Sequence, residues 1–216
     1  MRNVNDKIMV MPLFTNPLMQ IQLDLDLEKI TELAFQTCYH NPKGVQQSNK
    51  GGWQSDNLVE ETHEEFIRFK KVINRHLQIY HAEIFSGMEF NENITQHIDN
   101  MWVNINEKHH YNDWHVHPGS ALSGVFYIKH DGSKENGEIL FKRSNGTYFS
   151  LSHWPGGLIK TLNEVTAEVI NIKPRQNMLL IFPAWLEHKV EMNLKDDTRI
   201  SLSFNSGPIN LDKKND

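Results

Sequence analysis

The sequence predicts a mainly β fold preceded by two helices, and three observations carry this prediction. The N-terminal part repeats apolar residues at the threes and fours that helices require. From about Phe90 the chain changes to short runs rich in β-branched and aromatic residues, separated by Gly, Asn and Asp. Several short strands at this spacing are typical of a β-sandwich or barrel. We therefore expect two β layers, with the N-terminal helices packed on one sheet.

Residues 1–89 are interpreted as an N-terminal elaboration of this fold. The prolines between Ile8 and Leu23 predict an edge strand with a turn. Helical spacing follows from Asp26 to Tyr39, and the longest helical pattern runs from Asn57 to Phe85. The apolar positions of that longer pattern are Leu58, Phe66, Phe69, Ile73, Leu77 and Tyr80.

Residues 90–208 are interpreted as the β core, and residues 209–216 as a frayed tail. Together with the elaboration they form one predicted domain over residues 1–216, a length that suits a single substantial core. The expected strands are Thr95–Ile105, Ala121–Lys129, Gly137–Phe141, Glu168–Ile172, Met178–Phe182, Lys189–Met192 and Arg199–Phe204.

Composition excludes several classes of protein. The net charge of −5 makes steering onto nucleic acid an unfavoured function. Cys38 is the single cysteine, which excludes an intrachain disulfide and a thiolate metal cluster. No apolar run approaches the roughly 18 residues of a membrane span, and the N-terminus lacks the apolar core of a signal peptide. We expect a cytoplasmic protein without a membrane partner, and a homodimer is compatible with general priors.

Two histidines separated by one residue are the strongest functional signal. His115 and His117 precede the apolar run Leu122 to Ile128, and side chains at i and i+2 of an extended strand share a face. A third histidine, His188, stands at the start of a later strand. Neutral imidazoles bind Fe(II) well, so these three predict a metal site. The alternative is that they are exposed or hydrogen-bonded histidines, which are common in β-rich proteins.

An arginine and a serine follow the third histidine in Arg199-Ile200-Ser201. A guanidinium is always charged and binds a carboxylate through a two-pronged fork. Ser201 shares the face of Arg199 and can donate a second hydrogen bond. The pair therefore predicts a carboxylate-binding site, and the alternative is a surface ion pair of Arg199 with Asp196 or Asp197, worth little.

Four segments, in their order and spacing, resemble the 2-oxoglutarate- and Fe(II)-dependent oxygenases of the prolyl-hydroxylase-like superfamily. More narrowly, they are similar to a branch with an HxH motif found in bacteria and phages. The resemblance implies a double-stranded β-helix, the cupin-like jelly roll. The segments are His115–Ile128, Gly137–Phe141, Ile181–His188 and Arg199–Asn205.

The resemblance also implies roles for single residues. His115 and His188 match the two iron-binding histidines of the family. Arg199 matches the basic residue that pairs with the distal carboxylate of 2-oxoglutarate, and Tyr127 matches a tyrosine that hydrogen-bonds the same carboxylate. Asn104 stands where a polar contact to the cosubstrate is common. No catalytic residue beyond the metal ligands is expected.

His117 departs from the wider superfamily, which has Asp or Glu at this position. A neutral third ligand leaves the iron centre with one more positive charge, which affects its preference for Fe(II) and its reactivity. Asp113 lies two residues before His115 and is an alternative ligand, or a carboxylate that orients a ligand histidine.

The predicted function is that of an Fe(II)- and 2-oxoglutarate-dependent oxygenase, which hydroxylates a substrate and releases succinate and CO2. The missing carboxylate at His117 leaves open a non-catalytic module that binds a metal or ligand. A three-histidine zinc hydrolase is a second alternative. The sequence places no Glu as an obvious general base for it, although Glu187 adjoins His188.

Overall fold

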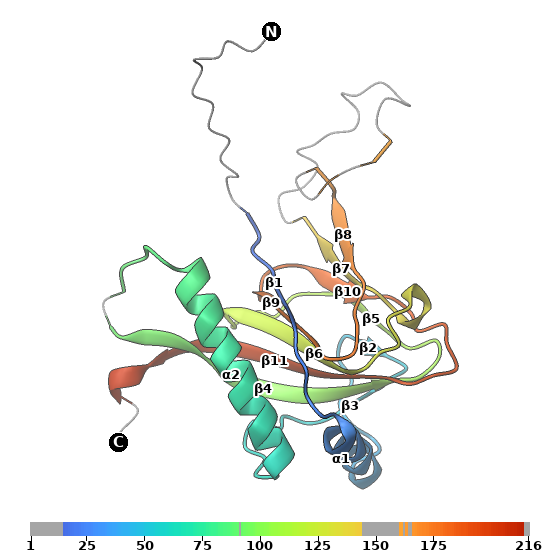
Figure 1. Cartoon of the computed structure of the whole chain (residues 1–216). Coiled ribbons are helices and arrows are strands. Elements are labelled where there is room, and N and C mark those ends of the chain that lie inside the picture. The colour runs from blue at the N-terminus through green and yellow to red at the C-terminus, as the bar shows by residue number, and fades with distance from the viewer. Residues whose placement is uncertain (1–14, 91, 144–159, 162, 164–165, 214–216) are drawn as a thin grey trace.

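Two antiparallel β-sheets and two helices make up the fold in the computed structural model, which describes residues 15–90, 92–143, 160, 161, 163 and 166–213 (Figure 1). Within these residues, one sheet has six strands in the order β1-β9-β6-β11-β4-β3, and the other has five in the order β2-β5-β10-β7-β8. This arrangement confirms the predicted jelly roll with N-terminal helices. The elements are β1 (Met19–Gln22), α1 (Glu28–His40), β2 (Asn49–Lys50), β3 (Trp53–Gln54), α2 (Glu64–Ile84), β4 (Ile94–Asn106), β5 (Tyr111–His115), β6 (Leu122–Lys129), β7 (Ile139–Lys142), β8 (Val169–Ile172), β9 (Met178–Pro183), β10 (His188–Val190) and β11 (Arg199–Asn210), with 3-10 helices at Lys134–Asn136 and Leu211–Lys213.

The six-stranded sheet has two different faces, because successive side chains of a strand point to opposite sides. On β6, Phe126 and Ile128 join the apolar cluster under α1 and α2, whereas Val125 and Tyr127 point between the sheets. Figure 1 shows α2 lying along the outer face of this sheet. The helices therefore seal one face, and the other face is left to build the interior of the sandwich.

The long strand β11 sets the register of that interior. It pairs with β4 on one side and with β6 on the other. Arg199 stands opposite Asn106, and Ser201 stands opposite both Asn104 and Tyr127. Since paired residues share a face, three neighbouring strands present these polar side chains to the space between the sheets.

The longer helix begins later than the sequence predicts. The chain at Asn57 and Leu58 pairs with β4 instead, where Leu58 N donates to Met101 O at 2.7 Å and Met101 N donates to Asn57 Oδ1 at 3.1 Å. These bonds hold the start of the segment against β4 and outside the helix, and α2 begins at Glu64. No helix in the described part of the chain is long and apolar enough to cross a membrane.

Two further expectations need correction. Residues 209 and 210 are not a frayed tail, because Ile209 pairs with Thr95 and Asn210 with Ile94 at the end of β11. The strands β2, β3 and β5 were not expected, and β5 carries His115. The predicted edge strand is realised at its C-terminal end as β1, whereas its residues 8–14 lie outside the described residues.

Phe69 of α2 and Phe126 of β6 are expected to hold the helix on the sheet. Their ring centroids lie 5.1 Å apart and both side chains are buried. Phe69→Ala should lower the free energy of unfolding by about 3–5 kcal/mol, measured by urea denaturation. Phe35→Ala, at a side chain that is 45% exposed, is the control and should change it by less than about 0.5 kcal/mol. Equal effects of the two variants would contradict this packing.

Candidate metal centre

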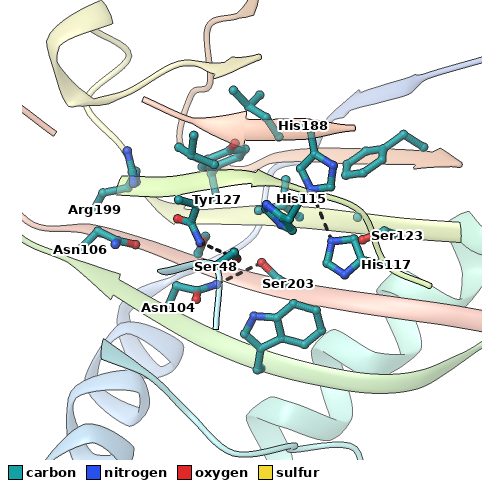
Figure 2. Close-up of a pocket in the computed structure, with 18 residues that line it drawn as sticks. Ser48, Asn104, Asn106, His115, His117, Ser123, Tyr127, His188, Arg199 and Ser203 are labelled. Atoms are coloured by element: carbon teal, nitrogen blue, oxygen red, sulfur yellow. Dashed lines mark hydrogen bonds between the residues drawn. The ribbon is translucent and has the colours of Figure 1, made fainter. Parts of the chain in front are cut away.

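Three histidines come together between the two sheets. His115 ends β5 and His188 begins β10, and the two residues are paired directly across these strands. His117 lies two residues beyond β5, where its main-chain N donates to Ala184 O at 2.9 Å. Their candidate ligand nitrogens all lie within 4.8 Å of one another. Figure 2 shows the three imidazoles grouped together. The expected convergence is present, but His117 reaches the site from a turn and not from the same strand as His115.

Main-chain carbonyls orient two of the imidazoles. His115 Nδ1 lies 2.7 Å from Asp113 O, and His188 Nδ1 lies 2.8 Å from Leu186 O. A carbonyl only accepts, so each Nδ1 carries the proton and each Nε2 keeps its lone pair for a metal. His117 Nε2 lies 3.4 Å from His188 Nε2 and donates to it in this tautomer, so the third imidazole reaches the same point and can bind a metal once that proton leaves.

Burial keeps the histidines uncharged at neutral pH. Removal from water lowers the pKa of His188 to about 3 and that of His117 to about 4, and repulsion from the neighbouring imidazoles adds to both effects. The pKa of His115 is also lowered, first by burial. Neutral imidazole is the form that binds a transition metal, so the donor set fits a divalent metal ion.

Asp113 takes no direct part in this group. Its side chain is exposed, and its Oδ1 accepts from Trp114 N at 2.8 Å. The group of metal-ligating side chains found among the described residues consists of the three histidines alone. Asp113 orients His115 through its main-chain carbonyl and not, as the sequence suggested, through its carboxylate.

The guanidinium of Arg199 lies at the other end of the same pocket (Figure 2). It is buried, and Nη1 donates to Asn136 O at 2.8 Å and to Glu191 O at 3.2 Å. Its Nη2 is buried with no partner among the described residues. The alternative of a surface ion pair is wrong, because Asp196 pairs with Lys108 and Asp197 with Lys129.

Tyr127 lies beside Arg199 with a hydroxyl that is also buried and unpartnered in the described structure. Burial raises the pKa of Tyr127, so its phenol stays protonated and can donate. Burial lowers the pKa of Arg199 to about 10, which leaves its guanidinium charged at neutral pH. Arg199 Nη2 and the Tyr127 hydroxyl are thus two donors without an acceptor in the described structure, and the guanidinium is charged. A carboxylate has two oxygen atoms that can accept from both.

A glycine makes room for the guanidinium. Gly137 has φ +95°, and a Cβ built on it would collide with Arg199 Nη1. The adjacent Asn136 supplies the carbonyl that accepts from Nη1, and its Nδ2 donates to Asn193 Oδ1 at 3.1 Å. The turn at residues 134–137 therefore fixes where Arg199 points.

The remaining polar candidates line the same pocket. Ser201 and Asn104 belong to its wall, and Asn104 Nδ2 donates to Ser203 Oγ at 3.1 Å. Five polar residues of the lining were not predicted, namely Ser48, Asn106, Asn112, Ser123 and Ser203. The alternation of polar residues along β4 and β11 is a signal that could have found Asn106 and Ser203. Ser48 and Asn112 carry no such signal, because they reach the pocket from a loop and a short strand.

The sequence of this region matches a known family. Residues 100–205 match the family described as "Putative 2OG-Fe(II) oxygenase", where 2OG is 2-oxoglutarate. This segment contains the three histidines, Tyr127 and Arg199. No curated protein sequence matches the chain.

Solved structures share the fold. A Pseudomonas putida prolyl-4-hydroxylase has a TM-score of 0.58 at 12% identity, over 90% of this chain and 95% of its own. The viral collagen prolyl hydroxylase of Paramecium Bursaria Chlorella virus-1 has a TM-score of 0.54 at 13% sequence identity, and the match covers 88% of this chain and 94% of the viral chain. The epimerase SnoN of nogalamycin biosynthesis is described as 2-oxoglutarate-dependent. It has a TM-score of 0.61 at 13% sequence identity, and the match covers 89% of this chain and 78% of SnoN. At these identities the matches show a common architecture.

Adding one methyl group at Gly137 is expected to displace Arg199. Gly137→Ala should cost about 1–3 kcal/mol more free energy of unfolding than Gly132→Ala, because overpacking adds to the backbone strain. Gly132 is a matched control: its φ is +78°, and the nearest atom to a built Cβ is Arg175 Cγ at 3.8 Å. Chemical denaturation of both variants measures the difference, and equal costs would exclude a close guanidinium.

Acidification is expected to destabilise the metal-free protein. The folded pKa values of about 3 for His188 and about 4 for His117 lie below the ordinary 6.5, so the unfolded chain binds more protons between these values. The free energy of unfolding should fall below pH 6.5 by up to about 1.4 kcal/mol per pH unit for each histidine, with no contribution above that pH.

Urea denaturation in chelator between pH 5 and 8 measures this slope. His188→Leu should remove the contribution of one histidine, whereas His76→Leu, at a histidine of α2 outside the pocket, should leave the slope of the site unchanged. A His188→Leu protein with the wild-type slope would show that His188 is not held neutral.

Proposed function

We propose that the protein is an Fe(II)- and 2-oxoglutarate-dependent oxygenase that hydroxylates its substrate and releases succinate and CO2, and the match of residues 100–205 to the 2OG-Fe(II) oxygenase family supports this proposal. One observation carries the proposal. The pocket that holds three neutral imidazoles also holds two donors, Arg199 Nη2 and the Tyr127 hydroxyl, that have no partner in the described part of the chain.

His115, His117 and His188 are proposed to hold the iron. Main-chain carbonyls accept from Nδ1 of His115 and His188, so the Nε2 atoms of these two residues face the site unprotonated. All three imidazoles are neutral, which suits a divalent ion that prefers nitrogen ligands. When bound, iron with 2-oxoglutarate and O2 supplies an oxidant that inserts oxygen into a C–H bond. A three-histidine set leaves open positions for a cosubstrate, as an oxygenase site requires.

Arg199 is proposed to fix the distal carboxylate of 2-oxoglutarate. Its charge is already buried, so an anion that binds there gains a strong interaction without further desolvation of the guanidinium. Tyr127 donates a second hydrogen bond to the same carboxylate. Ser201 lies opposite Tyr127 on the neighbouring strand and is proposed to add a third.

The apolar side of the pocket is proposed to keep water from the reacting atoms. Val125, Ile139, Phe182 and Val190 line it, and the rings of Phe182 and His188 lie 4.7 Å apart. Exclusion of water protects a reactive oxidant and strengthens the electrostatic contacts of the cosubstrate. The chain thus supplies orientation and a dry cavity, and the cofactor supplies the chemistry.

The zinc hydrolase is disfavoured because it lacks a base. No Asp or Glu of the described residues lines the pocket. Glu187 adjoins His188 in sequence, but its carboxylate pairs with Lys142 Nζ at 2.9 Å. A hydrolytic water would therefore find only the histidines, which are engaged as ligands. The non-catalytic alternative, a module that only binds a metal or ligand, is distinguished by one measurement: it forms no succinate, whereas the oxygenase does.

Iron-loaded protein is expected to convert 2-oxoglutarate to succinate, and two variants should separate the functions of the site. Arg199→Met should raise the Kd for 2-oxoglutarate at least about 100-fold, the value of a lost charge-assisted pair, and leave metal content unchanged. His188→Ala should lose the metal, and His76→Ala is the control that keeps it. Calorimetry, metal analysis and succinate assay give the three readouts.

The outcomes distinguish the alternatives. Saturable 2-oxoglutarate binding without any succinate would favour the binding module. Full metal occupancy in His188→Ala, or unchanged 2-oxoglutarate affinity in Arg199→Met, would sink the proposed site.

A further inference from the structure

The interior of the sandwich has two halves of different chemistry. Between β6 and β9 on one sheet and β7 and β10 on the other, apolar side chains such as Leu180, Phe141 and Val125 form a packed cluster. The space between β4 and β11 on one sheet and β2 and β5 on the other is lined by amides and hydroxyls. The residues of this second half that the cosubstrate does not use are Ser48, Asn104, Asn106, Asn112 and Ser203, and they are here called the amide wall.

Side chains of the amide wall are tied to one another or to the strand behind them. Asn112 Nδ2 donates to Ser48 Oγ at 3.3 Å and Asn104 Nδ2 donates to Ser203 Oγ at 3.1 Å, and both bonds are drawn in Figure 2. Asn106 Nδ2 donates to Asn49 Oδ1 at 2.7 Å. These bonds order the wall in advance, which lowers the entropic cost of ligand binding.

One acceptor of the wall is left over. Asn104 is only 4% exposed, and its Oδ1 has no partner among the described residues. A buried amide oxygen without a donor costs about 1–3 kcal/mol, so a ligand that donates to it restores a lost hydrogen bond. The carboxylates and keto group of 2-oxoglutarate only accept, and they do not fit this atom.

The wall also selects against charge. Of the residues that line the pocket, Arg199 alone carries a permanent charge, and the proposed function engages it with the cosubstrate. A charged group placed against the wall would lose its hydration and find no counter-ion, which is costly. An uncharged group with hydroxyl or amide donors would lose little, because the wall offers hydrogen bonds in return.

We propose that the amide wall is the substrate site, and that it takes an uncharged, hydrogen-bond-donating part of the substrate, a hydroxyl or amide group that donates to Asn104 Oδ1. This inference rests on the proposed function, since it assigns the cosubstrate to Arg199 and leaves the wall free beside the metal. It narrows the substrate to molecules whose segment next to the reacting carbon is neutral and polar.

Three small planar molecules of the same size test the inference. Acetamide is neutral and donates, acetone is neutral and only accepts, and acetamidinium donates but is charged. Ligand-observed NMR on the Zn(II)- and 2-oxoglutarate-loaded protein gives their Kd values at millimolar concentrations, the range that so few atoms allow. Acetamide is expected to bind at least about tenfold more tightly than either of the others.

The matched variants are Asn104→Leu and Asn205→Leu. Asn205 is also buried and its Oδ1 also lacks a partner among the residues that the structure describes, but it does not line the pocket. Asn104→Leu should abolish the preference for acetamide and leave the Kd of 2-oxoglutarate within about twofold, and Asn205→Leu should change neither. Asn104→Ala repeats the test if the leucine variant does not fold.

Three results would overturn the inference. The first is acetamide that binds no better than acetone or acetamidinium, or not at all. The second is a preference that survives in Asn104→Leu. The third is a loss of 2-oxoglutarate affinity in Asn104→Leu but not in Asn205→Leu. That result would mean that the Asn104 amide is flipped, so that its Nδ2 donates to the cosubstrate and its Oδ1 accepts from Ser203. Failure of the proposed function would be recognised separately, because the wild-type protein would then not bind 2-oxoglutarate.

Discussion

A buried positive charge without a counter-ion is the constraint on which the rest of the site depends. Arg199 stands at the start of β11, where two carbonyls accept from Nη1 and Nη2 finds no acceptor among the described residues. Desolvating a guanidinium is costly, and neutral carbonyls repay only part of that cost. Gly137 leaves the space that Nη1 occupies. The Tyr127 side chain lies close enough to Arg199 to interact with its charge. We propose that a carboxylate from outside the chain neutralises this charge, and the other proposals for the site depend on that one.

The strand register turns this constraint into a site. Pairing of β11 with β4 and β6 sets Arg199, Ser201, Asn104 and Tyr127 on one face, and pairing of β5 with β10 sets His115 beside His188 on the sheet opposite. The helices cover the other face of the six-stranded sheet and leave the pocket open between the layers. One sandwich therefore places three imidazoles, a buried guanidinium and a wall of neutral polar side chains around one small space.

Much of this was predictable from sequence, because the residues that carry it lie in strands with strong patterns. The long strands, the helices and the three histidines with Arg199 followed from local pattern and order. The two-residue strands β2 and β3 did not, since so few residues show no period. The wall residues Ser48 and Asn112 meet only through pairing between distant segments, which one sequence does not encode locally. The domain limits, a homodimer and a cytoplasmic location stay predictions.

The most direct test of the central claim is a crystal structure of the protein with Mn(II) and 2-oxoglutarate, with the metal located by anomalous scattering. Our account predicts one metal peak bound by Nε2 of His115, His117 and His188, and a 2-oxoglutarate carboxylate within hydrogen-bond distance of Arg199 Nη2 and the Tyr127 hydroxyl. A metal bound away from the three histidines, or 2-oxoglutarate that leaves Arg199 Nη2 without a partner, would contradict it.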